Sequence, residues 1–404
     1  MKLSNIASIF LYLICFILCL LLARAYQHKL EQLIREEENK SGINIFWKRI
    51  AIATIISLPL LLLAAVRGDI VGVDTQEYSR YFYTYCRQFP DFASYYKYRK
   101  EDVLYSLISV LVYKYTKSVI PLFFIMEFFT VVPIILVGTK KVKDIPLWKI
   151  VSVYCFWFFN DSLNANRQYA AVGLLFLAYD LFFSNKKLRS LIPFLMAAGI
   201  HFSALLFGPL LLGINYMMKS KHIKIWKQLV PILAIAFLIF GRYGFQWLHS
   251  AGVLPYRYIL YINTFINGRG SDASITWSVI NIRTIIFCLI RILITFLLYF
   301  ITSQKKKNKF VEINHYNYKY IYLLNTIMYV GGVIILHTSY VIRITIFLDF
   351  FTVIILPYLD NYSRLKTGKN KAFYSLWFSI IYWFIHTVFL GESASIPYEF
   401  RVEQ

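Results

Sequence analysis

The chain has 404 residues, a net charge of +22, a hydrophobic content of 58% and a mean hydropathy of +0.56. Soluble domains are roughly 45–50% apolar, so this composition excludes an ordinary soluble protein and predicts a polytopic membrane protein. The positive charge gathers in short loops between apolar stretches, which is the positive-inside pattern and argues against a nucleic-acid-binding protein. The five cysteines have neither metal-type spacing nor the pattern of a disulfide framework.

The first apolar segment, 6–23, is followed by the charged residues 24–40 rather than by a cleavage site, so a retained membrane helix is predicted. Successive basic clusters mark cytoplasmic loops, and the chain must cross the membrane an even number of times between them. Apolar pairs fill the intervals: 50–66 with 119–138, 147–160 with 168–184, 188–200 with 203–218, 228–242 with 279–302, and 319–337 with 340–358. Segment 372–390 is predicted to make the last crossing, from the cytoplasm to the outside.

This pattern predicts an all-α fold with about twelve transmembrane or re-entrant helices and both chain ends outside. The whole chain, 1–404, is expected to form a single membrane domain with outer loops 67–118 and 243–278. Segment 188–218 is short for two crossings and carries interrupting prolines, so a re-entrant hairpin is an alternative. Val103–Tyr115 is predicted as a helix at the outer surface, since counting it as a span would move the next lysine-rich loop outside.

A first polar motif follows the second span and runs from Arg67 to Tyr78. Gly68 and Gly72 allow turns with positive φ, which can present backbone N–H groups to an anion, while Arg67 adds a fork of donors. Asp74, with Glu77 three residues later, also resembles the start of a helix. The alternative is that Asp74 only caps this helix and that Arg67 only anchors the end of the span.

A second motif, Asn160–Gln168, places polar side chains between two aromatic-rich spans. It is either a plain outer loop or part of a site. Arg167 would lie at the outer N-terminus of the next helix, where the helix dipole also favours an anion.

The third motif is Gly199–Ser203, with His201 at the bend of an interrupted hairpin. His201 is either a satisfied core histidine or a group that transfers a proton. In a fourth motif, Arg343 opens another span from the outside, and Arg283 lies near the outer end of its own span.

Charged residues also lie deeper in the spans, at Glu127, Arg291 and Asp349. Arg343 and Asp349 are six residues apart and do not face each other on a helix, so Asp349 is expected to meet another helix. Buried ion pairs that hold helices together are at least as good a reading of these groups as a functional one.

These motifs, in this order and spacing, resemble the EpsG family of exopolysaccharide polymerases, relatives of the Wzy-type polymerases of O-antigen and capsule. The resemblance covers about 50–400 and rests on four groups of residues: Arg67 with Gly72-Val-Asp74-Thr75-x-x-Tyr78, Arg167-Gln168-x-x-Ala171, His201-Phe-Ser203-Ala204, and Arg343 before a Leu-Pro-ended helix. The flank of Arg343, Ile342-Arg343-Ile-Thr, departs from the expected aromatic-polar pattern, which weakens the assignment of Arg343.

The resemblance implies a helical membrane glycosyltransferase of the GT-C-like kind in a bacterial cytoplasmic membrane, with its active face outside. Its substrate would be a polyprenyl-pyrophosphate oligosaccharide, and a chain-length regulator would be a further partner. Arginines can hold and neutralise the pyrophosphate leaving group. The expected pyrophosphate-binding residues are Arg67, Arg167, Arg343 and Arg283. Asp74 or His201 would accept the proton of the acceptor hydroxyl, with Arg167 counted among the catalytic residues.

Neither a nucleotide-binding loop nor a metal-type cluster is visible, so no cofactor or metal is expected. Two other classes remain open. A transporter or flippase of lipid-linked sugars would rely on midplane charges rather than on outer arginines. An O-antigen ligase would share the arginine chemistry with a different acceptor, and an acyltransferase would need a histidine buried in the bilayer.

Overall fold

The computed structural model describes residues 1–39, 43–99, 102–184, 186–252, 282–303, 318–336, 341–367 and 374–401. In these ranges the regular elements are all helices, which confirms the predicted all-α protein. The chain forms two compact units: unit 1 comprises 1–208 and 352–404, and unit 2 comprises 209–351. The single membrane domain stays a prediction.

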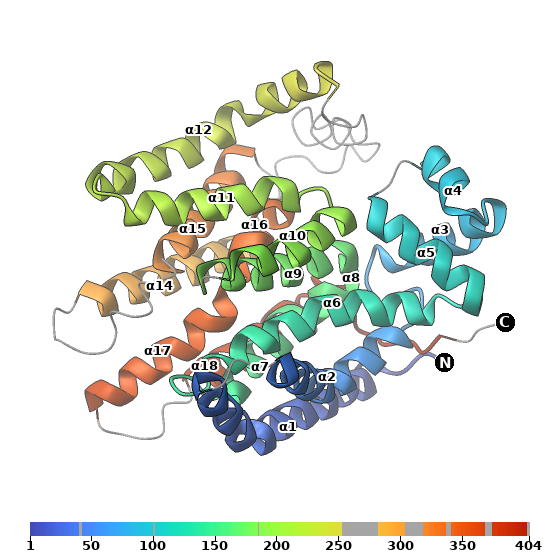
Figure 1. The fold of residues 1–404 in the computed structure, drawn as a ribbon, viewed down its shortest axis with the longest axis horizontal. Coiled ribbons are helices and arrows are strands. Elements are labelled where there is room, and N and C mark those ends of the chain that lie inside the picture. Colours follow the sequence, from blue (N-terminus) through green and yellow to red (C-terminus); the bar gives the residue numbers. More distant parts are fainter. Residues whose placement is uncertain are drawn as a thin grey trace. The chain divides into compact units, whose positions relative to one another are not determined.

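Unit 1 contains the first half of the chain and its C-terminal part (Figure 1). Its helices are α1 (Asn5–Asn39), α2 (Ile43–Ala65), α3 (Thr75–Gln88), α4 (Phe92–Arg99), α5 (Val103–Thr116), α6 (Ile120–Thr139), α7 (Leu147–Val153), the π-helix η1 (Tyr154–Phe158), α8 (Phe159–Asn164), α9 (Asn166–Phe183), α10 (Lys187–Ile200), α17 (Thr352–Thr367), α18 (Tyr374–Trp383) and the π-helix η4 (Phe384–Phe389). Helix α11 (Ala204–Lys219) crosses from unit 1 into unit 2.

Helix α1 shows why these elements suit a membrane. Within its apolar part, 6–23, buried side chains such as Tyr12 and Phe16 and exposed ones such as Phe10 and Ile14 are all hydrophobic. A helix that is apolar all round belongs in lipid or in a large core. In the described part of the chain, three helices are long and apolar enough to cross a membrane: Asn5–Glu37, Asn44–Ala65 and Ile120–Thr139. The number of about twelve stays a prediction.

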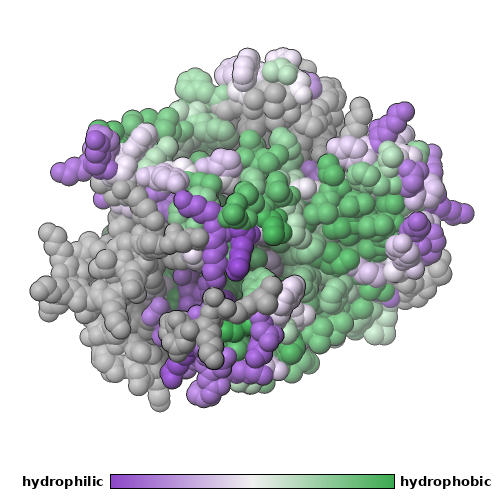
Figure 2. All heavy atoms as spheres, viewed as in Figure 1, coloured by the Kyte–Doolittle hydropathy of each residue, from purple (hydrophilic) through white to green (hydrophobic). Residues whose placement is uncertain are grey.

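Hydrophobic side chains cover broad areas of the surface, while hydrophilic ones gather in separate groups (Figure 2). Inside unit 1, α2 packs on α6, α6 on α9, and α9 on α10. Gly173 allows the close contact of α9 with α6, because a Cβ there would come within 2.6 Å of the Phe129 carbonyl oxygen.

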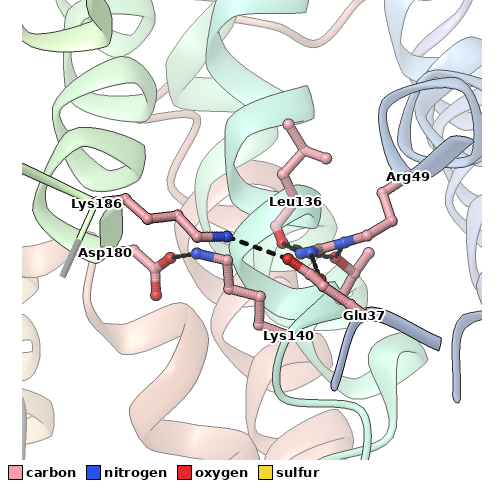
Figure 3. A network of polar contacts seen from close by, with 7 residues as sticks. Glu37, Arg49, Leu136, Lys140, Asp180 and Lys186 are labelled. Atoms are coloured by element: carbon pink, nitrogen blue, oxygen red, sulfur yellow. Dashed lines mark hydrogen bonds and ion pairs between the residues drawn. The ribbon is translucent and has the colours of Figure 1, made fainter. Parts of the chain in front are cut away.

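One end of unit 1, where α6 ends and α10 begins, carries a network of charged side chains and is called the lysine end (Figure 3). Arg49 donates to Glu37 over 2.8 Å and to the Leu136 carbonyl over 3.1 Å. Lys186 contacts Glu37 at 3.1 Å. A second pair, Lys140 with Asp180, lies beside them in Figure 3. These lysines belong to the loops that the charge pattern places in the cytoplasm.

The opposite end of unit 1, where α2 ends and α9 begins, is called the arginine end. Both chain ends lie here and pair with each other: the Leu3 amide donates to Tyr398 O at 2.9 Å, and the Phe400 amide donates to Met1 O at 2.9 Å. The two chain ends therefore lie together, and their position outside the membrane stays a prediction. Helix α6, with 20 residues, separates the two ends of the unit by about 30 Å, the thickness of a hydrocarbon core.

The structure corrects several predicted boundaries. Helix α1 continues past residue 23 to Asn39, because a helix needs no apolar side chains once it leaves the lipid. The predicted outer loop 67–118 is largely helical, in α3, α4 and α5. The last of these confirms the helix at Val103–Tyr115, and its position at the outer surface stays a prediction.

Two further differences lie in the second half of the chain. Helix α12 (Ile223–Ser250) extends into the predicted loop 243–278, whose residues 253–278 lie outside the described ranges. The predicted span 340–358 divides into α16 (Val341–Asp349) and α17. The break is a tight turn, in which the Phe351 amide bonds the Leu348 carbonyl at 3.4 Å instead of continuing the helical pattern.

Unit 2 holds α12, α14 (Ile282–Ser303), α15 (Tyr318–Leu336) and α16, with α15 in contact with the other three. Two charged side chains meet in its interior, as predicted for Asp349. Arg291 Nη2 donates to Asp349 Oδ2 at 3.0 Å, and Asn325 donates to Asp349 Oδ1 at 2.9 Å. Such a buried pair holds α14, α15 and α16 together, since either charge alone would be costly in an apolar interior.

Candidate functional site

The turn after α2 depends on two glycines for different reasons. Gly72 has φ +88°, as the sequence predicts, and a Cβ there would lie 2.9 Å from Asn164 Cα. Gly68 does not need a positive φ. It needs space, because a Cβ would lie 2.5 Å from Glu399 Oε2. Together they let residues 68–74 fold tightly between α8 and the C-terminal segment.

Replacing Gly72 by alanine should destabilise the protein. The left-handed conformation costs an L-residue roughly 1–2 kcal/mol, and the contact with the Asn164 backbone adds to this because backbone cannot move aside. Thermal unfolding in detergent would measure the loss. Gly213→Ala is the matched control, since Gly213 lies in α11 with open space around it. Equal melting temperatures for the two variants would contradict this assignment.

Arg67 is buried beneath this turn, with 1% of its surface exposed. Its Nη1 donates to the Ala64 carbonyl at 2.6 Å, and its guanidinium lies 3.8 Å from the centroid of the Phe123 ring. Its Nη2 is buried without a hydrogen-bond partner. Burial lowers the pKa of Arg67 to about 10, partly offset by the attraction of Glu127. Arg67 therefore keeps its charge at neutral pH, with a donor group unused.

The first and second sequence motifs meet at this point. Thr75 Oγ1 donates a hydrogen bond to the Leu163 carbonyl at 3.2 Å. The same oxygen accepts a hydrogen bond from Arg67 Nε at 3.4 Å. The Asp74 amide donates to Asn164 Oδ1 at 2.9 Å. Residues almost 90 positions apart are thus bonded, so the Arg67 turn and the Asn160–Gln168 loop form one structure.

Asp74 precedes α3 at the N-cap position, but its side chain makes no capping hydrogen bond. Asp74 therefore occupies the predicted start of the helix without the side-chain hydrogen bond that a capping aspartate usually makes. Its half-buried carboxylate lies at the arginine end, beside the loop that leads to Arg167.

Arg167 is the second residue of α9, which confirms that it lies at a helix N-terminus. Its guanidinium packs over two tyrosine rings, 4.7 Å from the centroid of Tyr105 and 5.4 Å from that of Tyr78. Its Nη1 is 3.9 Å from Asp102 Oδ2. The aromatic rings and one carboxylate hold this charge in a partly open position.

Asp102 also binds the third motif. Its Oδ1 accepts the Phe202 amide at 3.0 Å, so one buried carboxylate connects Arg167 with the His201 bend. Sequence reasoning missed Asp102, which follows the charged Arg99–Glu101 run and resembles an ordinary surface residue. Gly199 assists the contact, because a Cβ there would meet Leu104 at 2.8 Å.

The surroundings of His201 assign its tautomer. The Ser203 amide can only donate, and it points at His201 Nδ1 over 3.3 Å. The Ser203 hydroxyl lies 2.6 Å from the same nitrogen. Nδ1 is therefore the acceptor, and the neutral ring carries its proton on Nε2. In this form His201 offers a hydrogen-bond donor rather than a base.

Other polar groups at the arginine end were not found from the sequence as site residues. Glu127 accepts bonds from Tyr154 at 2.5 Å and from Ser162 at 3.0 Å. His386 Nε2 lies 3.8 Å from Asp161 Oδ2. His386 carried the same signal as His201, a lone histidine in an apolar helix.

Arg401, near the end of the chain, joins the site from a distant part of the sequence. Its Nη2 lies 2.6 Å from Asp69 Oδ1 and 2.8 Å from Ser79 Oγ, while its Nε donates to Arg67 O at 3.2 Å. No sequence signal indicated this, because Arg401 lies in a short segment near the end of the chain that contains no motif.

The structure brings together four of the predicted residues, Arg67, Asp74, Arg167 and His201, at the arginine end of unit 1. The other two, Arg283 and Arg343, belong to α14 and α16 of unit 2, and their side chains lie outside the described residues. In the ranges where side chains are described, no three His, Cys, Asp or Glu residues gather as a metal site.

The sequence pattern of the EpsG family matches residues 50–400, which include all six predicted site residues. No curated protein and no solved structure shows a significant match to the chain. The match covers well over half of the chain and contains the motifs that meet at the arginine end. This chain therefore belongs to the EpsG family, the family of Wzy-like exopolysaccharide polymerases.

Proposed function

We propose that this protein joins oligosaccharide repeat units carried on polyprenyl pyrophosphate, at the outer leaflet of the bacterial cytoplasmic membrane. The observation that carries the proposal is the convergence of Arg67, Arg167, Asp74 and His201 at one end of unit 1, opposite the lysine end. Family membership supports a polymerase-type reaction. The positive-inside pattern supports an outer position for the arginine end.

The reaction transfers a growing glycan from its lipid carrier to the sugar of the next lipid-linked unit. The acceptor hydroxyl oxygen bonds to the anomeric carbon, and the bond from that carbon to the pyrophosphate oxygen breaks. The electron pair leaves with the pyrophosphate. Arg67 and Arg167 bind this group and offset the charge that develops on it. The proton passes from the acceptor hydroxyl to the Asp74 carboxylate.

His201 then orients the substrate through its Nε2–H. Replacing His201 by glutamine should keep the polymerisation rate within about tenfold of the wild type, because the amide still donates near that position. If His201 were the base, the same change should cost about 10²–10⁴-fold. Single-turnover rates of His201→Gln and His201→Ala, compared at equal protein, separate the two roles.

The interior charges favour a polymerase over a flippase. A transporter would use Arg291 and Asp349 along its path, yet Arg291 donates to Asp349, and Asn325 donates to the same carboxylate. A pair satisfied in this way holds helices together.

The decisive experiment mixes purified protein with a synthetic polyprenyl-pyrophosphate repeat unit and sizes the products on a gel. A ladder of products supports the proposal. A single transferred block would identify a ligase instead, and vesicle uptake of substrate without any product would identify a transporter.

A further inference from the structure

The C-terminal segment 396–401 is built into the arginine end. The Gly68 amide donates to Glu399 O at 2.6 Å, and the Arg401 amide donates to Val66 O at 2.8 Å. Between them, the fully buried Tyr398 donates its hydroxyl to Leu63 O at 2.5 Å. These bonds hold the segment on both sides of the Arg67 backbone, so the position of Arg401 is well defined.

This segment brings a second guanidinium next to the first. Arg67 and Arg401 lie over the same ring, 3.8 Å and 5.5 Å from the centroid of Phe123. The Arg401 side chain is only 6% exposed. Two like charges held side by side in a poorly hydrated place repel each other, which is costly unless an anion lies between them or beside them.

The carboxylate that offsets the positive charge of Arg401 belongs to Asp69, which is far more exposed than Arg401 itself. Asp69, 2.6 Å from Arg401 Nη2, is 46% exposed, so water can reach it and another anion can replace it. Arg67 Nη2, in contrast, is buried without any hydrogen-bond partner. Arg67 therefore offers Nη2 as an unused donor. Arg401 offers Nη2, whose present partner, the Asp69 carboxylate, can be replaced by another anion.

We propose that Arg401 is a further phosphate-binding residue of this site, and that the Asp69 carboxylate occupies its guanidinium until a phosphate oxygen takes its place. Arg67 and Arg401 would each bind one phosphate of the pyrophosphate group, with Phe123 behind both. This inference deepens the proposed function and rests on it for the identity of the ligand. It assigns to the C-terminal segment a role in substrate binding.

The test compares two variants that break the same ion pair, Arg401→Gln and Asp69→Asn. Binding of inorganic pyrophosphate to the purified full-length protein in lipid nanodiscs is measured by calorimetry. Losing Arg401 should weaken binding about tenfold or more, since charge-assisted bonds to phosphate are strong. Losing the Asp69 charge should tighten binding several-fold, because the competing carboxylate is gone.

A different result is expected if the ion pair between Arg401 and Asp69 only anchors the C-terminal segment. Both variants would then change pyrophosphate affinity in the same direction or leave it unchanged, and would lower the melting temperature alike. Either result would overturn the proposal, as would a wild-type protein that does not bind pyrophosphate. The exposed pair Arg80 and Glu77, 2.6 Å apart on α3, provides the control. Arg80→Gln and Glu77→Gln carry the same charge changes and should leave the affinity unchanged.

The product ladder separates this inference from the proposed function. Opposite effects of the two variants on pyrophosphate affinity, without a ladder from the lipid-linked substrate, would support the phosphate site and reject the polymerase reaction. A normal ladder and unchanged pyrophosphate affinity in Arg401→Gln would reject the inference alone.

Discussion

Replacing Arg67 by lysine should abolish polymer growth while the protein is still made and inserted. Arginine supplies several donors in a fixed plane, of which Nη1 binds Ala64 O and Nη2 remains for a phosphate oxygen. An ammonium group cannot serve both positions or lie flat on Phe123. Loss of one preorganised donor to a developing anion costs about 10²–10³-fold in rate. The product ladder and a single-turnover rate measure this loss.

Arg67 also supports the fold, so its variant needs a matched control. Arg49 is the counterpart at the lysine end: it is 4% exposed and donates to Leu136 O, Thr139 and Glu37. Arg49→Lys should lower the melting temperature by a similar amount but keep the ladder in the folded fraction. If both variants lose polymer in proportion to their folded fraction, Arg67 has only a structural role. Polymer of normal length from Arg67→Lys would remove Arg67 from the mechanism.

The second large effect is expected from Asp102→Ala. This change removes the acceptor of the Phe202 amide and the carboxylate beside Arg167, so the His201 bend and Arg167 lose their common support. A displacement of about 1 Å at a reacting centre can cost 10²-fold in rate. We expect a fall in the single-turnover rate of about that size.

Asp102→Asn separates the two contacts. Its amide oxygen still accepts the Phe202 amide, but the negative charge beside Arg167 is lost. We expect this variant to retain most of the activity, since a 3.9 Å pair with a partly exposed partner contributes little. Asp91→Ala serves as the control, because Asp91 caps the nearby α4 through Ser94 without touching the site. An Asp102→Ala variant as active as this control would show that Asp102 does not organise the site.

Some site residues carried a signal in the sequence and others did not. Arg67 and Arg167 stand out because a charge at the edge of an apolar span is costly, and Gly72 because turns with positive φ favour glycine. Asp102 follows an ordinary charged run, and Arg401 lies in a short segment without a motif. Their importance comes from partners that are distant in the sequence, Phe202 for Asp102 and Asp69 for Arg401. No local pattern encodes such contacts.

The sequence by itself determined that the protein is helical, that its helices suit a membrane, and which family it belongs to. Hydrophobicity and charge act locally, so they can be read from short stretches without knowing what packs on them. Only the tertiary structure decided that Asp74 precedes α3 without a capping bond from its side chain, that His201 carries its proton on Nε2, and that Arg401, near the end of the chain, lies beside Arg67. These properties depend on contacts between side chains that are distant in the sequence. Such contacts form only when the helices and connecting segments of the unit pack together.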